Sequence, residues 1–294
     1  MKNVQLVIID PQNDFMDTTT AALPVPGATD DMARLSSFIN RVGNKLDGIS
    51  VTLDSHATLD YRHPGAWKNQ NGENPVPITA GGAPITADDI RSGIWEPIYG
   101  NQPQAILGGQ TIRDFMIECA ENRNNQTGGA VPGLEIWPEH CIIGTEGHNV
   151  FPELMDALQQ WERDNKKYIN YCTKGTNPLT EHYGALEAND PIAADPSTSL
   201  NTNFLQTLQN GDFIVIAGEA ASHCVMSTVN QIVDNIGENG VKKLVLLTDC
   251  MSPVAAITDE QGNMIVDFPG MTDAWYAELE AKGVVLTTSV EFLA

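Results

Sequence analysis

The sequence contains few basic residues. Its 294 residues include 16 Lys and Arg against 38 Asp and Glu, which gives a formal net charge of −22 at pH 7. A surface with this charge repels phosphate backbones and anionic membranes, so we expect no nucleic-acid and no membrane partner. The balance suits a cytoplasmic enzyme that acts on a neutral or cationic small molecule, although acidity that only confers solubility would give the same composition.

Paired cysteines and long hydrophobic runs are also missing. The five cysteines are odd in number and include no Cys-x-x-Cys pair. This excludes a disulfide framework and a cysteine-only zinc site, and it favours a reducing compartment. The first apolar run, Val4 to Ile9, is short and ends at Asp10. We therefore interpret it as a buried strand rather than a signal peptide or a membrane span.

Short apolar runs alternate with amphipathic segments along most of the chain. Because the runs are apolar on both faces, we expect parallel strands covered by helices on both sides. The sequence thus predicts a doubly wound three-layer α/β/α fold with a mostly parallel central sheet. We expect strands at 4–9, 49–53, 168–173, 213–216, 243–248 and 284–288. We expect helices at 30–46, 151–165, 203–208, from Ser222 to about 237 and at 272–281, with a short helical piece at 180–188.

The alternation stops between residues 64 and 133. This stretch is rich in Gly, Pro and Asn, and only one helix, at about 111–121, is predicted within it. A structureless loop of this length is implausible in a compact domain. We therefore expect a single domain over 1–294 with an insertion at about 64–133 that has structure of its own and serves as a lid or an oligomer contact.

Cys224 follows the predicted strand 213–216 and a run of small residues. Ser222 is positioned to cap the next helix, which would place Cys224 in the first helical turn. There the helix dipole favours a thiolate and free N–H groups face a bound ligand. A lone cysteine is more often a small core residue, so the position alone does not identify a nucleophile.

Reactive side chains follow four of the predicted strands: Asp10, Asp54, Lys174 and Cys224. The carboxyl ends of parallel strands meet at one edge of a sheet, so these side chains can converge. An Asp can take the proton of a thiol, and a Lys can keep carboxylate and thiolate charged. Backbone N–H groups between 218 and 224 can stabilise an oxyanion.

A second group of residues suggests a metal site. Asp54 and His56 are two positions apart and point the same way if the segment is extended. His63 and His140 are further candidate ligands for a divalent metal. The spacing Asp-x-His is a weak signal when taken alone. His148, His182 and His223 have no comparable setting and are assigned no role.

Taken together, these segments resemble the isochorismatase-like cysteine hydrolases, and among them the nicotinamidases. The matching segments are Asp10-Pro-Gln-Asn-Asp-Phe15, Asp54-Ser-His56, Trp137-Pro-Glu-His140-Cys141, Lys174-Gly175 and Gly218-Glu-Ala-Ala-Ser-His-Cys224-Val225. They occur in the order in which the family has them and cover most of the chain outside the insertion.

The resemblance implies a role for each matching residue. Asp10, Lys174 and Cys224 would form the catalytic triad, and the amides of Ala220 and Cys224 the oxyanion hole. Phe15 and Trp137 would enclose the substrate ring. Asp54, His56 and His140 would bind one divalent ion, Zn, Fe or Mn. A cis peptide is expected at Glu219–Ala220. His63 lies one residue further from His56 than in the family, which leaves its ligand role open.

The implied activity is hydrolysis of nicotinamide to nicotinate and ammonia through a Cys224 thioester, as in NAD salvage. Because the sequence contains both the candidate metal ligands and Cys224, this activity is favoured over others in the superfamily. One alternative is another small amide, such as a ureido or carbamoyl compound. Another is a catalytically idle structural or binding protein whose insertion docks a partner. A homo-oligomer is compatible with each of these alternatives.

Overall fold

Six parallel strands form the centre of the computed structural model, which describes residues 2–258 and 261–294. Their order across the sheet is β10-β7-β6-β1-β2-β5, and each neighbouring pair is parallel. The predicted parallel sheet is confirmed, with small shifts at the strand ends. The bounds are β1 Val4–Ile9, β2 Gly48–Asp54, β5 Asn170–Lys174, β6 Phe213–Gly218, β7 Leu244–Leu247 and β10 Val285–Thr287.

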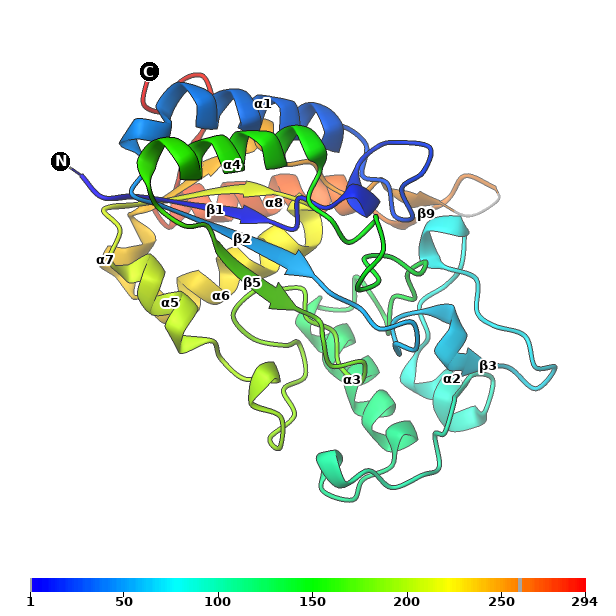
Figure 1. Cartoon of the computed structure of the whole chain (residues 1–294). Coiled ribbons are helices and arrows are strands. Elements are labelled where there is room, and N and C mark those ends of the chain that lie inside the picture. The colour runs from blue at the N-terminus through cyan, green and yellow to red at the C-terminus, as the bar shows by residue number, and fades with distance from the viewer. Residues whose placement is uncertain (1, 259–260) are drawn as a thin grey trace.

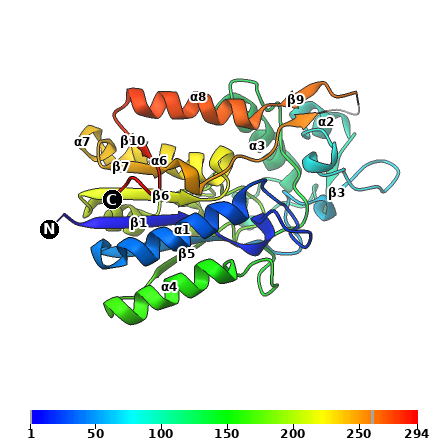
Figure 2. The ribbon, with the colours of Figure 1, turned by 90° about the horizontal axis from the view of Figure 1, so that it is seen from above.

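Helices cover both faces of this sheet, as the prediction required. α1 (Ala28–Val42) and α4 (Pro152–Asn165) pack side by side on one face, and α5 (Thr202–Gln209) and α6 (Met226–Ile236) lie on the other (Figures 1 and 2). The remaining helices of this part are α7 (Glu238–Val241) and α8 (Phe268–Ala281).

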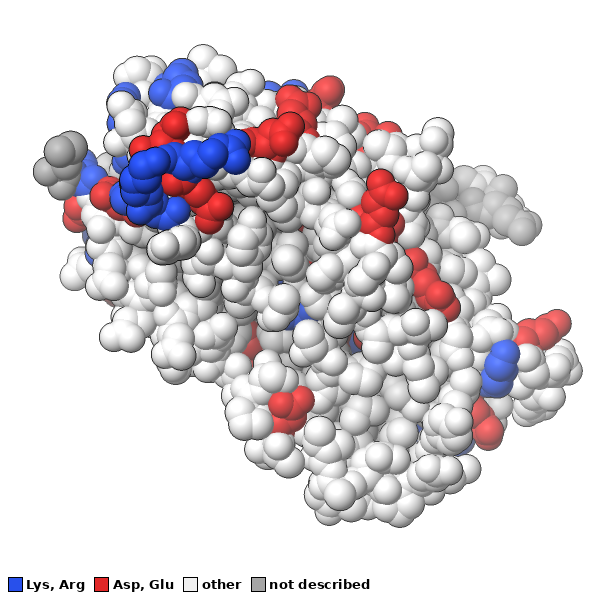
Figure 3. Space-filling model, viewed as in Figure 1, with Lys and Arg blue, Asp and Glu red and all other residues white. Residues whose placement is uncertain are grey.

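Basic side chains lie at the carboxyl ends of two helices, α1 and α4. Lys and Arg gather over the final turns of α1 and α4, where Arg41 and Arg163 lie (Figure 3). Positive charge at a helix carboxyl end interacts favourably with the partial negative charge there. This cluster therefore contributes to helix stability at the end of the sheet opposite the strand carboxyl ends.

The register of the sheet places the strand ends beside one another. Ile9 at the end of β1 pairs with Gly218 at the end of β6, and Asp54 at the end of β2 pairs with Lys174 at the end of β5. The residues that follow these strands consequently meet at one edge, as expected from parallel strands.

The short helical piece predicted at 180–188 is wrong, because this segment is irregular. Amides in its second half donate to side chains of α6: Ala185 N donates to Thr228 Oγ1, and Leu186 N donates to Gln231 Oε1. These tertiary hydrogen bonds replace the bonds to preceding carbonyls that a helix would form.

Two further features differ from the prediction, namely the end of the first helix and a small strand pair. The first helix ends at Val42 rather than at Leu46, and a 3₁₀ turn, Gly43–Lys45, follows it. Trp161 of α4 donates its indole N–H to the Gly43 carbonyl at 2.9 Å, which satisfies a carbonyl at the helix end. A small ladder of β8 (Ile257–Thr258) and β9 (Met264–Val266) was not predicted, because both strands are too short to give a pattern.

The insertion has its own core. It contains β3 (Trp67–Lys68), β4 (Glu96–Pro97), α2 (Ala87–Ser92) and α3 (Ile112–Gln126), and it lies beyond the carboxyl ends of β1, β2 and β5 (Figure 1). The predicted helix is confirmed as part of α3, whereas α2 and the two-stranded ladder were missed. A second hydrophobic cluster, separate from the core around the sheet, includes Trp67, Ile90, Phe115, Met116 and Leu134. Within the described residues, no helix has both the length and the apolar character to cross a bilayer.

Truncation of Trp67 tests whether this second core stabilises the protein. Trp67 is fully buried and donates its indole N–H to the Tyr61 carbonyl at 2.9 Å. We expect Trp67→Ala to lower the free energy of unfolding by about 3–5 kcal/mol, measured by urea denaturation. The control Tyr168→Ala removes an aromatic side chain that is 92% exposed and should change stability by less than about 0.5 kcal/mol. Equal effects of the two variants would contradict a structural core in the insertion.

Candidate active site

Lys174 connects the three other residues that the sequence placed at the strand ends. Its Nζ lies 2.8 Å from Asp10 Oδ2, 3.1 Å from Asp54 Oδ1 and 3.4 Å from Cys224 Sγ. The lysine is 2% exposed, although it is charged. Oxygens of Asp10 and Asp54 and the sulfur of Cys224 all lie within 4.8 Å of one another. The predicted convergence of these four side chains is therefore observed.

The strand ends hold Asp10 and Lys174 by specific local contacts. Asp10 has a φ of 43°, which is unusual for a residue other than glycine and occurs often at functional sites. Thr52, on the neighbouring strand, receives a hydrogen bond from Asp10 N and donates one to Asp10 Oδ1 at 2.5 Å. Gly175 has a φ of +76°, and a Cβ there would lie 2.8 Å from Asp54 Oδ1. Thr52 was not identified from the sequence, because a lone Thr inside a strand gives no motif.

Burial and charge act in opposite directions on the four groups. Burial raises the pKa of Cys224, while Lys174 lowers it. Burial lowers the pKa of Lys174, but Asp10 and Asp54 raise it by more, so the ammonium is retained. Burial raises the pKa of Asp10 above its usual range, with Lys174 opposing. Asp10 is thus the carboxylate that is better able to accept a proton.

The turn that carries Cys224 differs from the predicted helix start. Residues Ala221–Val225 form a π-helical turn, and α6 begins only after it. Ser222 is not a cap: its Oγ accepts from Val254 N and bonds to His223 Nδ1 at 2.8 Å. Burial raises the pKa of the Cys224 thiol in this turn. The peptide Glu219–Ala220 is cis, as the resemblance implied.

A cluster of imidazoles lies next to Asp54. His56 Nε2 is 3.0 Å and His140 Nε2 3.5 Å from Asp54 Oδ2, and His63 Nε2 is 3.3 Å from His140 Nδ1. His63, whose role the spacing left open, is therefore part of the cluster. The structure brings all four candidate ligands together.

The chemistry of this donor set fits a divalent cation. One carboxylate and three imidazoles are ligands that Zn²⁺ and similar ions prefer. Burial together with His140 and His56 lowers the pKa of His63 to about 2, so its ring is neutral and has a free lone pair. Its Nδ1 is buried and has no hydrogen-bond partner among the described residues. Burial lowers the pKa of His56, but Asp54 and Asp60 raise it by more, so the cluster attracts positive charge.

Asp60 orients this cluster and was missed by the sequence analysis. Its Oδ2 lies 2.9 Å from His56 Nδ1, so the other ring nitrogen of His56 faces Asp54. A carboxylate behind an imidazole fixes its tautomer and ring orientation in many metal sites. In the sequence, only the position of Asp60 four residues after His56 indicated that the two side chains could interact.

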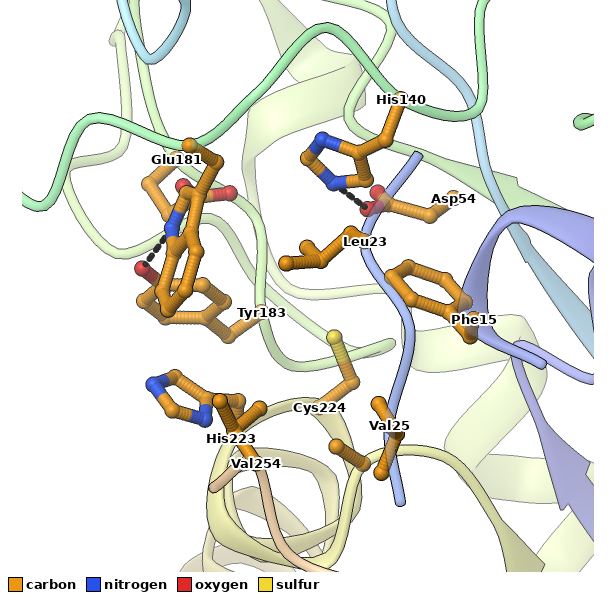
Figure 4. A pocket seen from close by; sticks show the side chains of 12 residues that line it. Phe15, Leu23, Val25, Asp54, His140, Glu181, Tyr183, His223, Cys224 and Val254 are labelled. Atoms are coloured by element: carbon orange, nitrogen blue, oxygen red, sulfur yellow. Dashed lines mark hydrogen bonds and ion pairs between the residues drawn. The ribbon is translucent and has the colours of Figure 1, made fainter. Parts of the chain in front are cut away.

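A small cavity opens above Cys224. Phe15 stands on one side of the sulfur and Tyr183 and His223 on the other, while Asp54 and His140 close a third side (Figure 4). Trp137 also lines the cavity and donates its indole N–H to Tyr183 Oη at 2.8 Å. Both predicted pocket residues, Phe15 and Trp137, therefore line this cavity. His223, which was assigned no role, is part of the wall.

Comparison with known proteins establishes the class of fold. The chain has the isochorismatase-like α/β fold that the motifs predicted, with the site at the carboxyl edge of its parallel sheet. Solved structures confirm this fold. Yeast nicotinamidase has a TM-score of 0.58 at 18% identity, covering 97% of this chain and 99% of that one. Acinetobacter baumanii nicotinamidase/pyrazinamidase gives 0.54 at 17% identity, covering 100% and 99%. The pyrazinamidase of Pyrococcus horikoshii, solved in complex with zinc, gives 0.51 at 17% identity, covering 97% and 99%. No family model and no curated protein matches the sequence.

Substitution of Asp60 tests whether the imidazole cluster binds metal. The variant Asp60→Asn keeps the shape of the side chain but removes the charge behind His56. We expect it to weaken zinc binding by about 10- to 100-fold, measured by competition with a chromophoric chelator. Asp156→Asn, on the exposed side of α4, is the control and should bind zinc like the unmodified chain. If the two variants bind zinc equally, Asp60 does not support a metal site.

Proposed function

We propose that the chain is a metal-dependent cysteine amidase that hydrolyses nicotinamide to nicotinate and ammonia. The observation that supports this most strongly is Lys174, which holds Asp10, Asp54 and the Cys224 sulfur around one buried ammonium. A thiol, a proton acceptor and a fixed positive charge are the groups that acyl transfer from an amide requires. The solved structures with this fold support the substrate class, since they include nicotinamidases.

In the first half of the reaction Asp10 takes the proton of Cys224, and the sulfur attacks the carboxamide carbon. The carbonyl oxygen gains negative charge, which the amides of Ala220 and Cys224 stabilise as an oxyanion hole. The C–N bond then breaks, the proton on Asp10 moves to the leaving nitrogen, and ammonia departs. A thioester between Cys224 and the acyl group remains.

In the second half water attacks the thioester carbon while Asp10 accepts its proton. The C–S bond breaks, the carboxylic acid leaves, and the proton returns to Cys224 Sγ. Lys174 partly offsets two negative charges, which lie on Asp10 and Asp54 before proton transfer and on Asp54 and the thiolate after it. Its burial excludes water from these charges and so strengthens their interaction.

The ring of the substrate would lie between Phe15 and Trp137. An aromatic ring gains about 0.5–1.5 kcal/mol from offset or edge-to-face contact with another, beyond the area it buries. Asp54, His56, His63 and His140 would hold the metal at the side of the cavity. The ion would act as a Lewis acid that accepts a lone pair of the ring nitrogen and so orients the carboxamide toward Cys224.

Removal of the thiol tests the proposed nucleophile. We expect Cys224→Ala to reduce ammonia release from nicotinamide by at least about 1000-fold, because no other group near Asp10 can form the acyl intermediate. Release is measured with a coupled ammonia assay. Cys172→Ala, on β5 of the same sheet, is the control and should retain the activity. Ammonia release by Cys224→Ala at an undiminished rate would exclude the mechanism.

Removal of metal distinguishes hydrolysis of nicotinamide from hydrolysis of the alternative substrates. A metal that orients the ring nitrogen is needed for nicotinamide but not for a ureido or carbamoyl compound. We therefore expect a chelator to abolish ammonia release from nicotinamide and stoichiometric zinc to restore it. The measurement is a panel of small amides, with and without chelator. A ureido compound hydrolysed faster than nicotinamide, with no effect of chelation, would favour the alternative substrate class.

A further inference from the structure

The insertion makes one charged contact with the wall of the cavity. Arg91 pairs with Asp88 and Glu121, and Arg113 donates to the carbonyls of Ile90 and Arg91, so both bond within the insertion. Arg123, near the end of α3, instead reaches Glu135 in the segment that leads to Trp137. Its Nε lies 2.7 Å from Glu135 Oε2 and its Nη2 2.5 Å from Oε1, a two-pronged pair.

Glu135 in turn faces His223. The carboxylate is 2% exposed, and its Oε1 is 3.7 Å from His223 Nε2. Burial raises the pKa of Glu135, but Arg123 and His223 together lower it by more, so the carboxylate stays charged. Ser222 Oγ bonds to His223 Nδ1 at 2.8 Å, whereas the buried His223 Nε2 faces Glu135 without a hydrogen bond to any described residue. The hydrogen bond at Nδ1 and the negative charge of Glu135 near Nε2 both favour this orientation of the imidazole.

Arg123 also contacts the second aromatic side chain of the wall. Its guanidinium lies 5.2 Å from the centre of the Tyr183 ring, a distance typical of a cation–π interaction. Tyr183 accepts the indole N–H of Trp137, and its ring centre is 5.4 Å from that of His223. Arg123 thus contacts the wall of three rings through Tyr183, while Phe268 packs against Trp137 and His223.

His223 and Tyr183 separate the cavity above Cys224 from a second, larger hollow on the other side. Both side chains line both spaces, and Arg123 lines the second hollow only. Figure 4 shows the two side chains together on one side of Cys224, opposite Phe15. If either ring moved, the two spaces would join and the cavity would be wider.

We propose that Arg123 is a positioning residue that fixes this aromatic wall and thereby limits the size of the ring that the cavity accepts. The inference rests on the proposed amidase function and gives the insertion a part in the substrate pocket. Arg123 acts through Glu135, His223 and Tyr183 and does not contact Cys224. Because the wall touches the ring equally in the ground state and the transition state, its loss should change KM far more than kcat.

The kinetic test compares Arg123→Gln with the unmodified chain on nicotinamide and on quinoline-3-carboxamide, which has a second fused ring. We expect KM for nicotinamide to rise about tenfold while kcat stays within about twofold. We expect the preference for the single ring, as the ratio of the two kcat/KM values, to fall about tenfold. Arg123→Lys, which keeps the charge but loses the planar fork, should lie between the two.

Arg91→Gln is the matched control, since it removes an arginine of the insertion whose ion pairs lie outside the pocket. It should leave both kinetic constants and the ring preference unchanged. Arg123→Gln leaves Glu135 buried without its cation, so thermal unfolding is recorded for each variant. If the single variant does not fold, the double variant Arg123→Gln/Glu135→Gln carries the same test with both charges removed. Unchanged KM and ring preference, or a loss confined to kcat, would overturn the proposal.

An activity-independent readout distinguishes this proposal from the proposed function. The Cys224 thiol displaces iodide from iodoacetamide and from an iodoacetamide that carries a naphthyl group, and peptide mass spectrometry gives both rates. We expect the unmodified chain to favour the small reagent strongly and Arg123→Gln to reduce that preference about tenfold, the change expected for a lost wall contact. A chain that releases no ammonia from any amide refutes the proposed function, whereas an unchanged alkylation ratio refutes the role of Arg123.

Discussion

The structure of the site depends on one buried positive charge. Lys174 is 2% exposed, and a buried ammonium costs several kcal/mol unless opposite charges compensate it. Asp10 and Asp54 supply that compensation from the ends of two other strands. The register of β1, β2 and β5 cannot shift without leaving the lysine unpaired. The charge that serves the chemistry thus also specifies how the strand ends are aligned.

The insertion is tied to this site at both of its ends. Its chain leaves directly after His63 and returns shortly before Glu135 and His140. His63 and His140 lie in contact, with ring nitrogens 3.3 Å apart. Closing a long loop costs entropy that grows only slowly with its length, so about 70 inserted residues are tolerated if the ends are fixed. A second hydrophobic cluster around Trp67 packs the inserted part together.

The sequence predicted the sheet, its covering helices and the convergence of Asp10, Asp54, Lys174 and Cys224, because alternating apolar runs and strand ends follow simple geometric rules. It did not predict contacts that depend on tertiary structure. The second half of segment 180–188 bonds to side chains of α6, and Glu135 finds Arg123 across the insertion. Pairs of this kind leave no periodic pattern, and in a chain with 38 acidic residues no single carboxylate stands out.

The position of Cys224 illustrates why a local rule was insufficient. A helix amino end stabilises negative charge by about 0.3–1 kcal/mol, and by about 2 kcal/mol in favourable buried geometries. Burying an unpaired charge costs several kcal/mol, which is larger. Burial accordingly raises the pKa of the thiol, while Lys174 lowers it. Under the proposed mechanism, formation of a thiolate therefore relies on Lys174 and on proton transfer to Asp10.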